Sequence, residues 1–254
     1  MYTIFNLNYL RVLRITSICI FLFNFEALAK EVISDENKIS NGTYVYDPFE
    51  RINRKILGFN IVFDDIAIQP LVTGYKAITP DIAEKGIANF FSNLKEPLTS
   101  ITFLIQGDFR KSFNSAGRFI TNTTTSLGLY DTSKHIGLKK AKNDMGIVLG
   151  KAGIKTGPYL IIPILGPTNF RDLAGRVSDF YINPIHLAGE STSSINSIGS
   201  GFNSRVNYNN ELNDLKSNSN DLYDSIKLLY HQRRMGEINK DHLRDLPVPR
   251  IYIE

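Results

Sequence analysis

Cysteine is nearly absent from this chain, since Cys19 is the single cysteine among its 254 residues. It lies in an apolar run, residues 15–25, which follows two arginines and precedes the small residues of Ala27-Leu28-Ala29. This is the pattern of a secretory signal peptide, so we expect residues 1–29 to be removed on export. The remaining chain would contain no thiol, which excludes disulfides, cysteine metal sites and a cysteine nucleophile.

Cys19 also lacks the sequence context of a lipid-modified cysteine. A lipoprotein is cut just before a cysteine that follows small residues, whereas the large residue Ile18 precedes Cys19 here. We therefore interpret Cys19 as part of the signal peptide and predict no lipid anchor at this position.

Long apolar runs are missing after the signal peptide. No stretch of 18 or more apolar residues occurs there, whereas a spanning helix needs roughly 20. A membrane role would then come from segments that lie in or under the bilayer surface. The formal charge of +4 is mild and no nucleic-acid motif accompanies it, so we predict no nucleic-acid partner.

Catalytic and metal-binding motifs are missing as well. Residues 146–152 are similar to a phosphate-binding loop, but the glycine spacing is one residue short and Ala152 replaces the hydroxyl that would hold magnesium. The four histidines are scattered, and no Gly-x-Ser-x-Gly elbow occurs. We predict a non-enzyme without metal or cofactor, with a lipid-acting hydrolase as a minor alternative.

Apolar residues recur every three or four positions, which predicts a mainly helical single domain over residues 46–188. Asp47 and Pro48 are expected to begin a first helix that extends to Phe63, and Thr79-Pro80 to begin a second. A third covers residues 98–105, and Asp108 is expected to cap a fourth. One-sided helices of this kind fit either an ordinary packed core or a ring whose outer face contacts lipid.

Two further segments allow two readings each. Residues 157–167 are uncharged and contain three prolines, which suits either a buried loop or a membrane-contacting loop. A basic loop carries Lys134, Lys139, Lys140 and Lys142. This loop either solubilises the chain or attracts anionic phospholipid headgroups.

The chain outside this domain divides by composition. Residues 30–45 are expected to form a linker, and residues 189–220, rich in Ser, Asn and Gly, a mobile or loosely packed stretch. Residues 221–238 predict a last helix with cations in its final turn, and residues 239–254 an extended tail.

A series of short motifs runs in order from Asp47 to about Pro184, with a further match at residues 223–234. They are Asp47-Pro48-Phe49-Glu50, Asn53-Arg54, Phe59-Asn60, Asp64, Pro70, Asn89-Phe90-Phe91-Ser92-Asn93-Leu94, Glu96-Pro97, Gln106-Gly107-Asp108, Arg118-Phe119, Asn122-Thr123-Thr124, Gly157-Pro158-Tyr159, Pro163, Leu165-Gly166-Pro167 and Arg171-Asp172. In this order they resemble the MlaA (VacJ) family of bacterial outer-membrane proteins.

The resemblance implies a ring-like assembly of short amphipathic helices on the periplasmic side of the cell outer membrane. Members of the family remove mislocalised phospholipids from the outer leaflet through an amphipathic channel. They pass the lipid to a periplasmic carrier, MlaC, and lie beside a trimeric porin. The alternative that we retain is an envelope scaffold that binds a porin or another partner without carrying lipid.

The resemblance and the helix pattern together suggest roles for twelve residues. An apolar or lipid-facing surface is expected for Phe59, Phe90, Phe91, Phe113 and Phe119. A membrane-contacting or channel-rim loop is expected for Tyr159, Leu160, Ile161 and Ile162. A buried ion pair or cap, or alternatively a headgroup contact, is expected for Arg118, Arg171 and Asp172.

Overall fold

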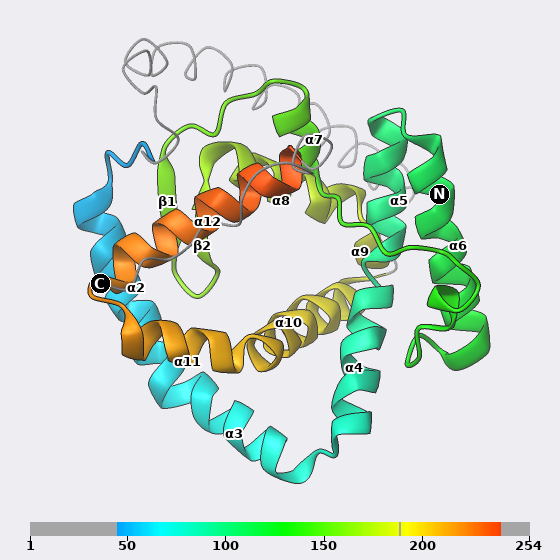
Figure 1. The fold of residues 1–254 in the computed structure, drawn as a ribbon, viewed down its shortest axis with the longest axis horizontal. Coiled ribbons are helices and arrows are strands. Elements are labelled where there is room, and N and C mark those ends of the chain that lie inside the picture. The colour runs from blue at the N-terminus through cyan, green and yellow to red at the C-terminus, as the bar shows by residue number, and fades with distance from the viewer. Residues whose placement is uncertain (1–44, 188, 240–254) are drawn as a thin grey trace, which may run out of the picture. The chain divides into compact units, whose positions relative to one another are not determined.

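Helices account for most of the regular structure in the computed structural model, which describes residues 45–187 and 189–239 (Figure 1). The elements belong to one compact unit that begins at Asp47. The predicted mainly helical, single-domain class is therefore confirmed. The signal peptide with Cys19, nearly all of the predicted linker, and the tail lie outside the described residues.

The first helical segment is longer than the sequence predicts. It consists of α2 (Glu50–Phe63), a π-helical segment η2 (Asp64–Ile68) and α3 (Gln69–Ile78). In the π turn, the backbone N–H of Gln69 bonds to the carbonyl of Asp64, five residues back. Pro70 has no N–H to donate, and the wider turn lets the helix continue through it. The apolar stripe seen in the sequence therefore covers α2 alone, and the helical segment continues beyond it.

The start of α2 lies two residues later than Asp47 and Pro48 predict. The N-cap position is Phe49, and no side chain caps it. Asp47 instead accepts a hydrogen bond from Asn53 Nδ2 at 2.9 Å and another from the hydroxyl of Tyr223. Asp47 therefore ties the start of α2 to the C-terminal helix.

The next three helices follow their predicted breaks closely. They are α4 (Asp81–Asn93), α5 (Glu96–Ile105) and α6 (Phe109–Ser126). Pro97 lies in the first turn of α5, where its missing N–H costs nothing. Asp108 caps α6 by accepting a hydrogen bond from the N–H of Lys111 at 3.0 Å. A short 3-10 turn, η3 (Thr132–Lys134), follows α6.

The proline-rich segment forms a hairpin between two helices. Helix α7 (Met145–Lys151) comes before it and α8 (Phe170–Ile182) after it. Strand β1 (Tyr159–Ile162) pairs antiparallel with β2 (Gly166–Asn169), with Tyr159 opposite Asn169 and Ile162 opposite Gly166. Both strands lie at an edge of this small sheet, where prolines are tolerated.

The Ser- and Asn-rich residues 189–220 are helical, so the expectation of a loosely packed stretch was wrong. After α9 (Pro184–Leu187) the chain forms α10 (Glu190–Asn207), α11 (Asn209–Asn218) and α12 (Leu222–Ile238). The small residues serve close packing: a Cβ atom added at Gly199 would lie 2.3 Å from the ring of Phe91 on α4. The last helix has Asp221 as its cap and continues to Ile238, so the prediction that cations lie in its final turn was wrong.

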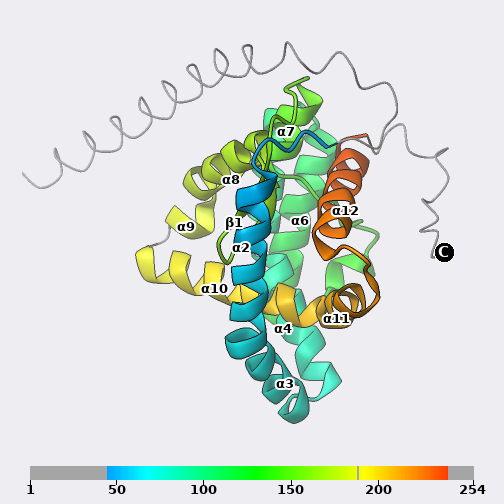
Figure 2. The same ribbon diagram turned by 90° about the vertical axis from the view of Figure 1, so that its left-hand side faces the viewer.

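The elements of this unit close into a circuit of contacts (Figures 1 and 2). Helix α2 contacts β1, β2 contacts α8 and α12, α8 contacts α9, and α10 connects α9 to α3 and α4. Among the described residues, buried polar side chains outnumber buried apolar ones. Much of the apolar surface therefore lies on the outside of the helices, which is the reverse of an ordinary soluble core.

Candidate membrane surface and polar pocket

The helical segment from Glu50 to Ile78 carries an extended apolar surface. By length and composition alone it could cross a membrane, and only 6% of its most apolar window is buried. At about 1.5 Å per residue its 29 residues extend about 44 Å, against a hydrocarbon core of roughly 30 Å. Its large exposed side chains are Ile52, Phe59, Val62, Ile66, Leu71 and Ile78.

The sequence pattern missed a helix of this length because Asp64, Asp65 and Pro70 interrupt the apolar residues. The structure neutralises the two acids from other helices. Asp64 pairs with Arg205 of α10 at 2.7 Å, and Lys216 of α11 lies 2.8 Å from both Asp64 and Asp65. These ion pairs point one side of the segment toward the circuit and leave the apolar side exposed.

A second set of exposed apolar side chains lies on α4, α5 and α6. Each of these side chains is at least 51% exposed, and in water each would cost free energy in proportion to its exposed apolar area. Apolar exposure of this extent marks an interaction surface. The set comprises Ile82, Leu104, Ile105, Phe109, Phe113 and Ile120.

Two asparagines of α2 hold the hairpin. Asn53 donates to the carbonyl of Tyr159 at 3.1 Å and accepts from the N–H of Ile161 at 2.9 Å. Two helical turns further along α2, Asn60 donates to the carbonyl of Ile162 and accepts from the N–H of Ile164. The two side chains take the place of a neighbouring strand, because they satisfy backbone N–H and carbonyl groups along β1 and in the turn that follows it.

A cluster of ion pairs centres on Asp172, at the start of α8. Asn169 caps the helix, and its Nδ2 donates to Asp172 at 2.9 Å. Arg171 and Arg234 both contact the same carboxylate, at 3.0 and 2.9 Å. Burial acts to raise the pKa of Asp172, but the hydrogen bond from Arg234 and the charge of Arg171 outweigh it, and the pKa lies below its usual range.

The cluster needs a glycine beside it. A Cβ atom added at Gly146 would lie 2.6 Å from Arg234 Nη2 and 2.8 Å from Asp172 Oδ1. The glycines of residues 146–152 therefore allow α7, α8 and α12 to approach closely. Arg234 itself bridges Asp172, Asp144 and Glu237.

A second buried cluster centres on Arg118 of α6. Its Nε donates to Glu96 at 2.8 Å, its Nη2 pairs with Asp131, and its Nη1 donates to the carbonyl of Leu138. The side chains of Arg118 and Glu96 are each 3% exposed. This guanidinium fastens α5, α6 and the following loop to one another.

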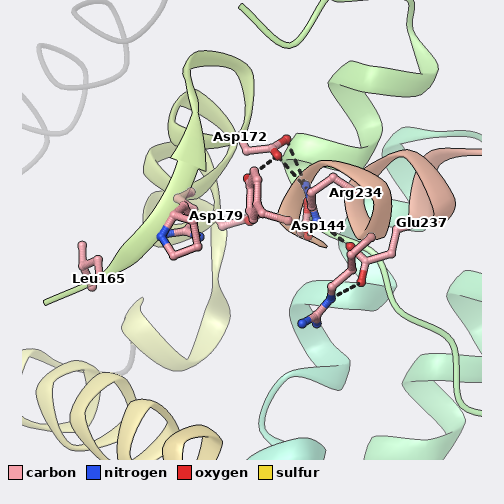
Figure 3. A pocket seen from close by; sticks show the side chains of 10 residues that line it. Asp144, Leu165, Asp172, Asp179, Arg234 and Glu237 are labelled. Carbon is pink, nitrogen blue, oxygen red and sulfur yellow. Dashed lines mark hydrogen bonds and ion pairs between the residues drawn. The ribbon is translucent and has the colours of Figure 1, made fainter. Parts of the chain in front are cut away.

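A polar pocket of about 290 Å³ lies among the hairpin, α8 and α12 (Figure 3). Figure 3 shows the carboxylates of Asp144 and Asp172 converging on Arg234, with Leu165 of the hairpin on another wall. The lining residues are Asp144, Leu165, Pro167, Asp172, Arg176, Asp179, Tyr230, Arg233, Arg234 and Glu237. The motifs in the sequence include Leu165, Pro167 and Asp172, and the further match at residues 223–234 includes the part of α12 that lines the pocket. No sequence pattern indicated Asp144, Arg176, Asp179 or Glu237.

Comparison with known proteins decides what the chain is related to. The family model for the MlaA lipoprotein matches residues 45–237. The chain belongs to the MlaA lipoprotein family.

Relatives of this MlaA protein come from several bacteria. A protein of Rickettsia bellii is 34% identical over 81% of this chain and 82% of its own length. A Rickettsia typhi protein is 41% identical, and the match covers 56% of this chain and 57% of that relative. The Escherichia coli protein named intermembrane phospholipid transport system lipoprotein MlaA is 31% identical over 53% of this chain and 56% of its own length.

A solved structure supports the fold. A chain described under "Structural basis for maintenance of bacterial outer membrane lipid asymmetry" has a TM-score of 0.68 and 28% identity to this chain. The match covers 76% of this chain and 99% of the other.

The apolar site residues expected for this MlaA protein lie in different environments. Phe59 and Phe113 are exposed, at 51% and 73%. Phe90, Phe91 and Phe119 are half-buried, and Phe90 and Phe91 pack edge to face. The ring of Phe91 also lies against Gly199 of α10, so this residue takes part in helix packing.

The hairpin residues divide by strand alternation. Tyr159 and Ile161 are 1% and 3% exposed and face α2 and α12, whereas Leu160 and Ile162 are half-buried. The strongly exposed residues lie at the turn, in Ile164 and Leu165. In this conformation the turn, rather than the strand, offers the surface for contact with a membrane or a channel.

The charged motif residues Arg118, Arg171 and Asp172 are each at most 3% exposed. They bind other protein groups in the two clusters, so the geometry favours a structural role for them over direct headgroup contact. In the basic loop, the backbone carbonyls of Leu138 and Lys139 accept hydrogen bonds from Arg118 and Asn114. Lys140 contacts the hydroxyl of Ser92 on α4.

Proposed function

We propose that this protein maintains outer-membrane lipid asymmetry by removing mislocalised phospholipids from the outer leaflet and passing them to a periplasmic carrier. The observation that carries this proposal is the combination of exposed apolar helices with a polar interior. Membership of the MlaA family and the likeness to the outer-membrane lipid asymmetry structure support it.

The geometry suggests how such a protein handles an amphipathic molecule. Apolar faces on α2–α3 and on α4–α6 would lie against acyl chains, where burial is favourable by about 25 cal/mol per Å². Polar groups in the interior would accompany the headgroup, so the headgroup is never left without hydrogen-bond partners. Moving a lipid in this way requires no covalent step, which agrees with the predicted non-enzyme.

Partners and location belong to the same proposal. We expect the chain to be exported, to lie at the periplasmic side of the outer membrane, and to meet an MlaC-like carrier and a trimeric porin. The name of the Escherichia coli relative, an intermembrane phospholipid transport lipoprotein, supports the lipid-transfer part of this proposal.

The first test measures phospholipid exposed on the surface of cells that lack this protein. We expect an increase over the parent strain, and a return to the parent level when the intact chain is restored. No change in surface phospholipid, in cells without a second transfer system, would favour the alternative of a scaffold that binds an envelope partner without carrying lipid.

A further inference from the structure

The polar pocket contains one cation and one carboxylate that the ion-pair clusters do not use. Arg234 is paired with Asp144, Asp172 and Glu237, and Arg233 is paired with Glu237 at 3.3 Å. Within residues 45–187 and 189–239, neither Arg176 nor Asp179 forms an ion pair. Both lie on α8 and both line the pocket.

Asp179 is a carboxylate that lacks a close cation. One of its oxygens accepts a hydrogen bond from the N–H of Met145 at 3.0 Å. Burial raises the pKa of Asp179 to about 7, and the charge of Asp144 adds to the increase, although Arg234 and Arg176 act against it. A positive group placed beside this carboxylate would recover the free energy that its burial costs.

Arg176 supplies the opposite charge on the same wall. It lies three residues before Asp179, one helical turn away, and the two side chains nevertheless do not pair. Arg176 is exposed, and its Nη2 donates to the carbonyl of Pro167 at 3.2 Å, which places the guanidinium beside the hairpin. Its other N–H groups remain in the fork geometry that suits a phosphate.

We propose that this pocket binds the zwitterionic headgroup of a phospholipid, with the ammonium beside Asp179 and the phosphate beside Arg176. This inference rests on the proposed function, and it adds a substrate class to it. A separated cation and carboxylate in one pocket complement a ligand that carries both charges, whereas an anionic headgroup without an ammonium would leave Asp179 unpaired.

The pocket is large enough for a headgroup. A water molecule occupies about 10–15 Å³ of a cavity volume of this kind, so a pocket of about 290 Å³ holds on the order of twenty such positions. That is enough for a phosphoethanolamine group. Leu165 and Pro167 supply an uncharged wall for the carbon atoms of such a group.

The test measures binding of soluble headgroups to the purified full chain in phospholipid-free detergent. Glycerophosphoethanolamine carries both charges, and glycerophosphoglycerol lacks the ammonium. We expect glycerophosphoethanolamine to bind at least fivefold more tightly than glycerophosphoglycerol at pH 8.

Two variants of the pocket test the assignment of the charges. Asp179→Asn, which retains an acceptor for Met145, should abolish this preference, and Arg176→Gln should weaken the binding of both ligands. Asp214→Asn and Arg110→Gln, which change exposed residues outside the pocket, serve as matched controls.

A pH series provides a second readout. The ammonium binds ionised Asp179, and at pH 6 only about a tenth of a carboxyl with a pKa of about 7 is ionised. Affinity for glycerophosphoethanolamine should therefore fall about fivefold to tenfold from pH 8 to pH 6, and Asp179→Asn should remove this dependence. Other charged or titratable groups also line the pocket around Asp179. They are Asp144 before α7, Asp172 and Arg176 of α8, and Tyr230, Arg233, Arg234 and Glu237 of α12, whereas the hairpin residues are uncharged.

Each possible result separates this inference from the proposed function. Equal affinity for the two ligands, or a preference that survives Asp179→Asn, overturns the headgroup site even if cells lacking the protein accumulate surface phospholipid. Binding of the soluble headgroup but not of lyso-phosphatidylethanolamine presented in detergent micelles would assign the pocket to a free small zwitterion and would also overturn a lipid headgroup site.

Discussion

Arg118 illustrates how single polar residues hold this protein together. It joins Glu96 of α5 to Asp131 and the carbonyl of Leu138 in the loop that follows α6. The sequence predicted a buried ion pair or cap as one of two readings for this residue, because an arginine in a motif cannot by itself reveal its partners. The partners became visible only when the fold brought α5 and α6 together.

Replacing Arg118 by alanine should destabilise the protein strongly. Glu96 would remain buried without its cation, and breaking a buried ion pair typically costs about 3–5 kcal/mol. We expect a large fall in the melting temperature, whereas Arg110→Ala, on the exposed side of the same helix, should change it little. A melting temperature equal for the two variants would show that the pair contributes nothing.

The same cluster predicts a pH dependence of stability. Burial acts to raise the pKa of Asp131, but hydrogen bonds from Ser133 and Arg118 outweigh it and lower the pKa to about 2. A carboxyl whose pKa is lowered by folding stabilises the protein above its unfolded pKa of about 3.9, and this contribution is lost as the pH falls toward 2.

The size of this contribution follows from the pKa difference, which corresponds to about 2.5 kcal/mol. The free energy of unfolding of the native protein should therefore exceed that of Asp131→Asn at pH 6, and the gap should narrow between pH 4 and pH 2. Denaturant unfolding at several pH values measures it. A gap that stays constant over this range would mean that Asp131 does not titrate as its contacts suggest.

Among the elements, local signals predicted helix starts better than helix lengths. Asp108 and Pro97 mark the starts of α6 and α5 because their chemistry acts within one turn. The continuation of α2 through Pro70 depends on a π turn and on cations from α10 and α11, which no local pattern contains. The sequence likewise did not predict that Asn53 and Asn60 hold the edge of the hairpin, since their partners lie about a hundred residues away in sequence.

Contact between α10 and α4 depends on Gly199. A side chain there would collide with the ring of Phe91, whereas Gly201 on the same helix has open space around its Cα. Gly199→Val should therefore cost about 1–3 kcal/mol more than Gly201→Val, because both changes share the same helix propensity and only one overpacks an interface. Chemical denaturation of the two variants measures the difference.

A second substitution identifies the cause. Phe91→Leu removes part of the ring and should recover some of the stability lost in Gly199→Val, which a double-mutant cycle would report as a favourable coupling. If the two changes are simply additive, the cost of Gly199→Val does not come from contact with Phe91.

At the scale of the whole molecule, the unusual property is the distribution of polarity. Composition and periodicity predicted one-sided helices, but they could not decide whether the apolar sides would face a core or the outside. The structure leaves Ile66, Ile78 and Ile82 at least three-quarters exposed while it buries arginine, aspartate and asparagine. The family and the mainly helical class were predictable because many short motifs occur in order over most of the chain.

This distribution predicts which surface enters a bilayer. In a chain whose Cys19 is replaced by serine, a cysteine at position 66 carries an environment-sensitive fluorophore, and a cysteine at the exposed position 211 serves as the control. We expect lipid-attached quenchers in liposomes to quench the probe at 66 and to leave the probe at 211 unaffected. Equal quenching at both positions would contradict the proposed membrane surface.

The central claim is that the protein moves intact phospholipid from a membrane to a soluble carrier. The most direct measurement places the full chain in liposomes with radiolabelled phospholipid, adds an MlaC-like carrier, and follows label in the carrier fraction. We expect label to appear there as whole phospholipid, with no released fatty acid. Label that stays in liposomes containing correctly inserted protein would contradict transport, and label that appears as free fatty acid would identify a hydrolase instead.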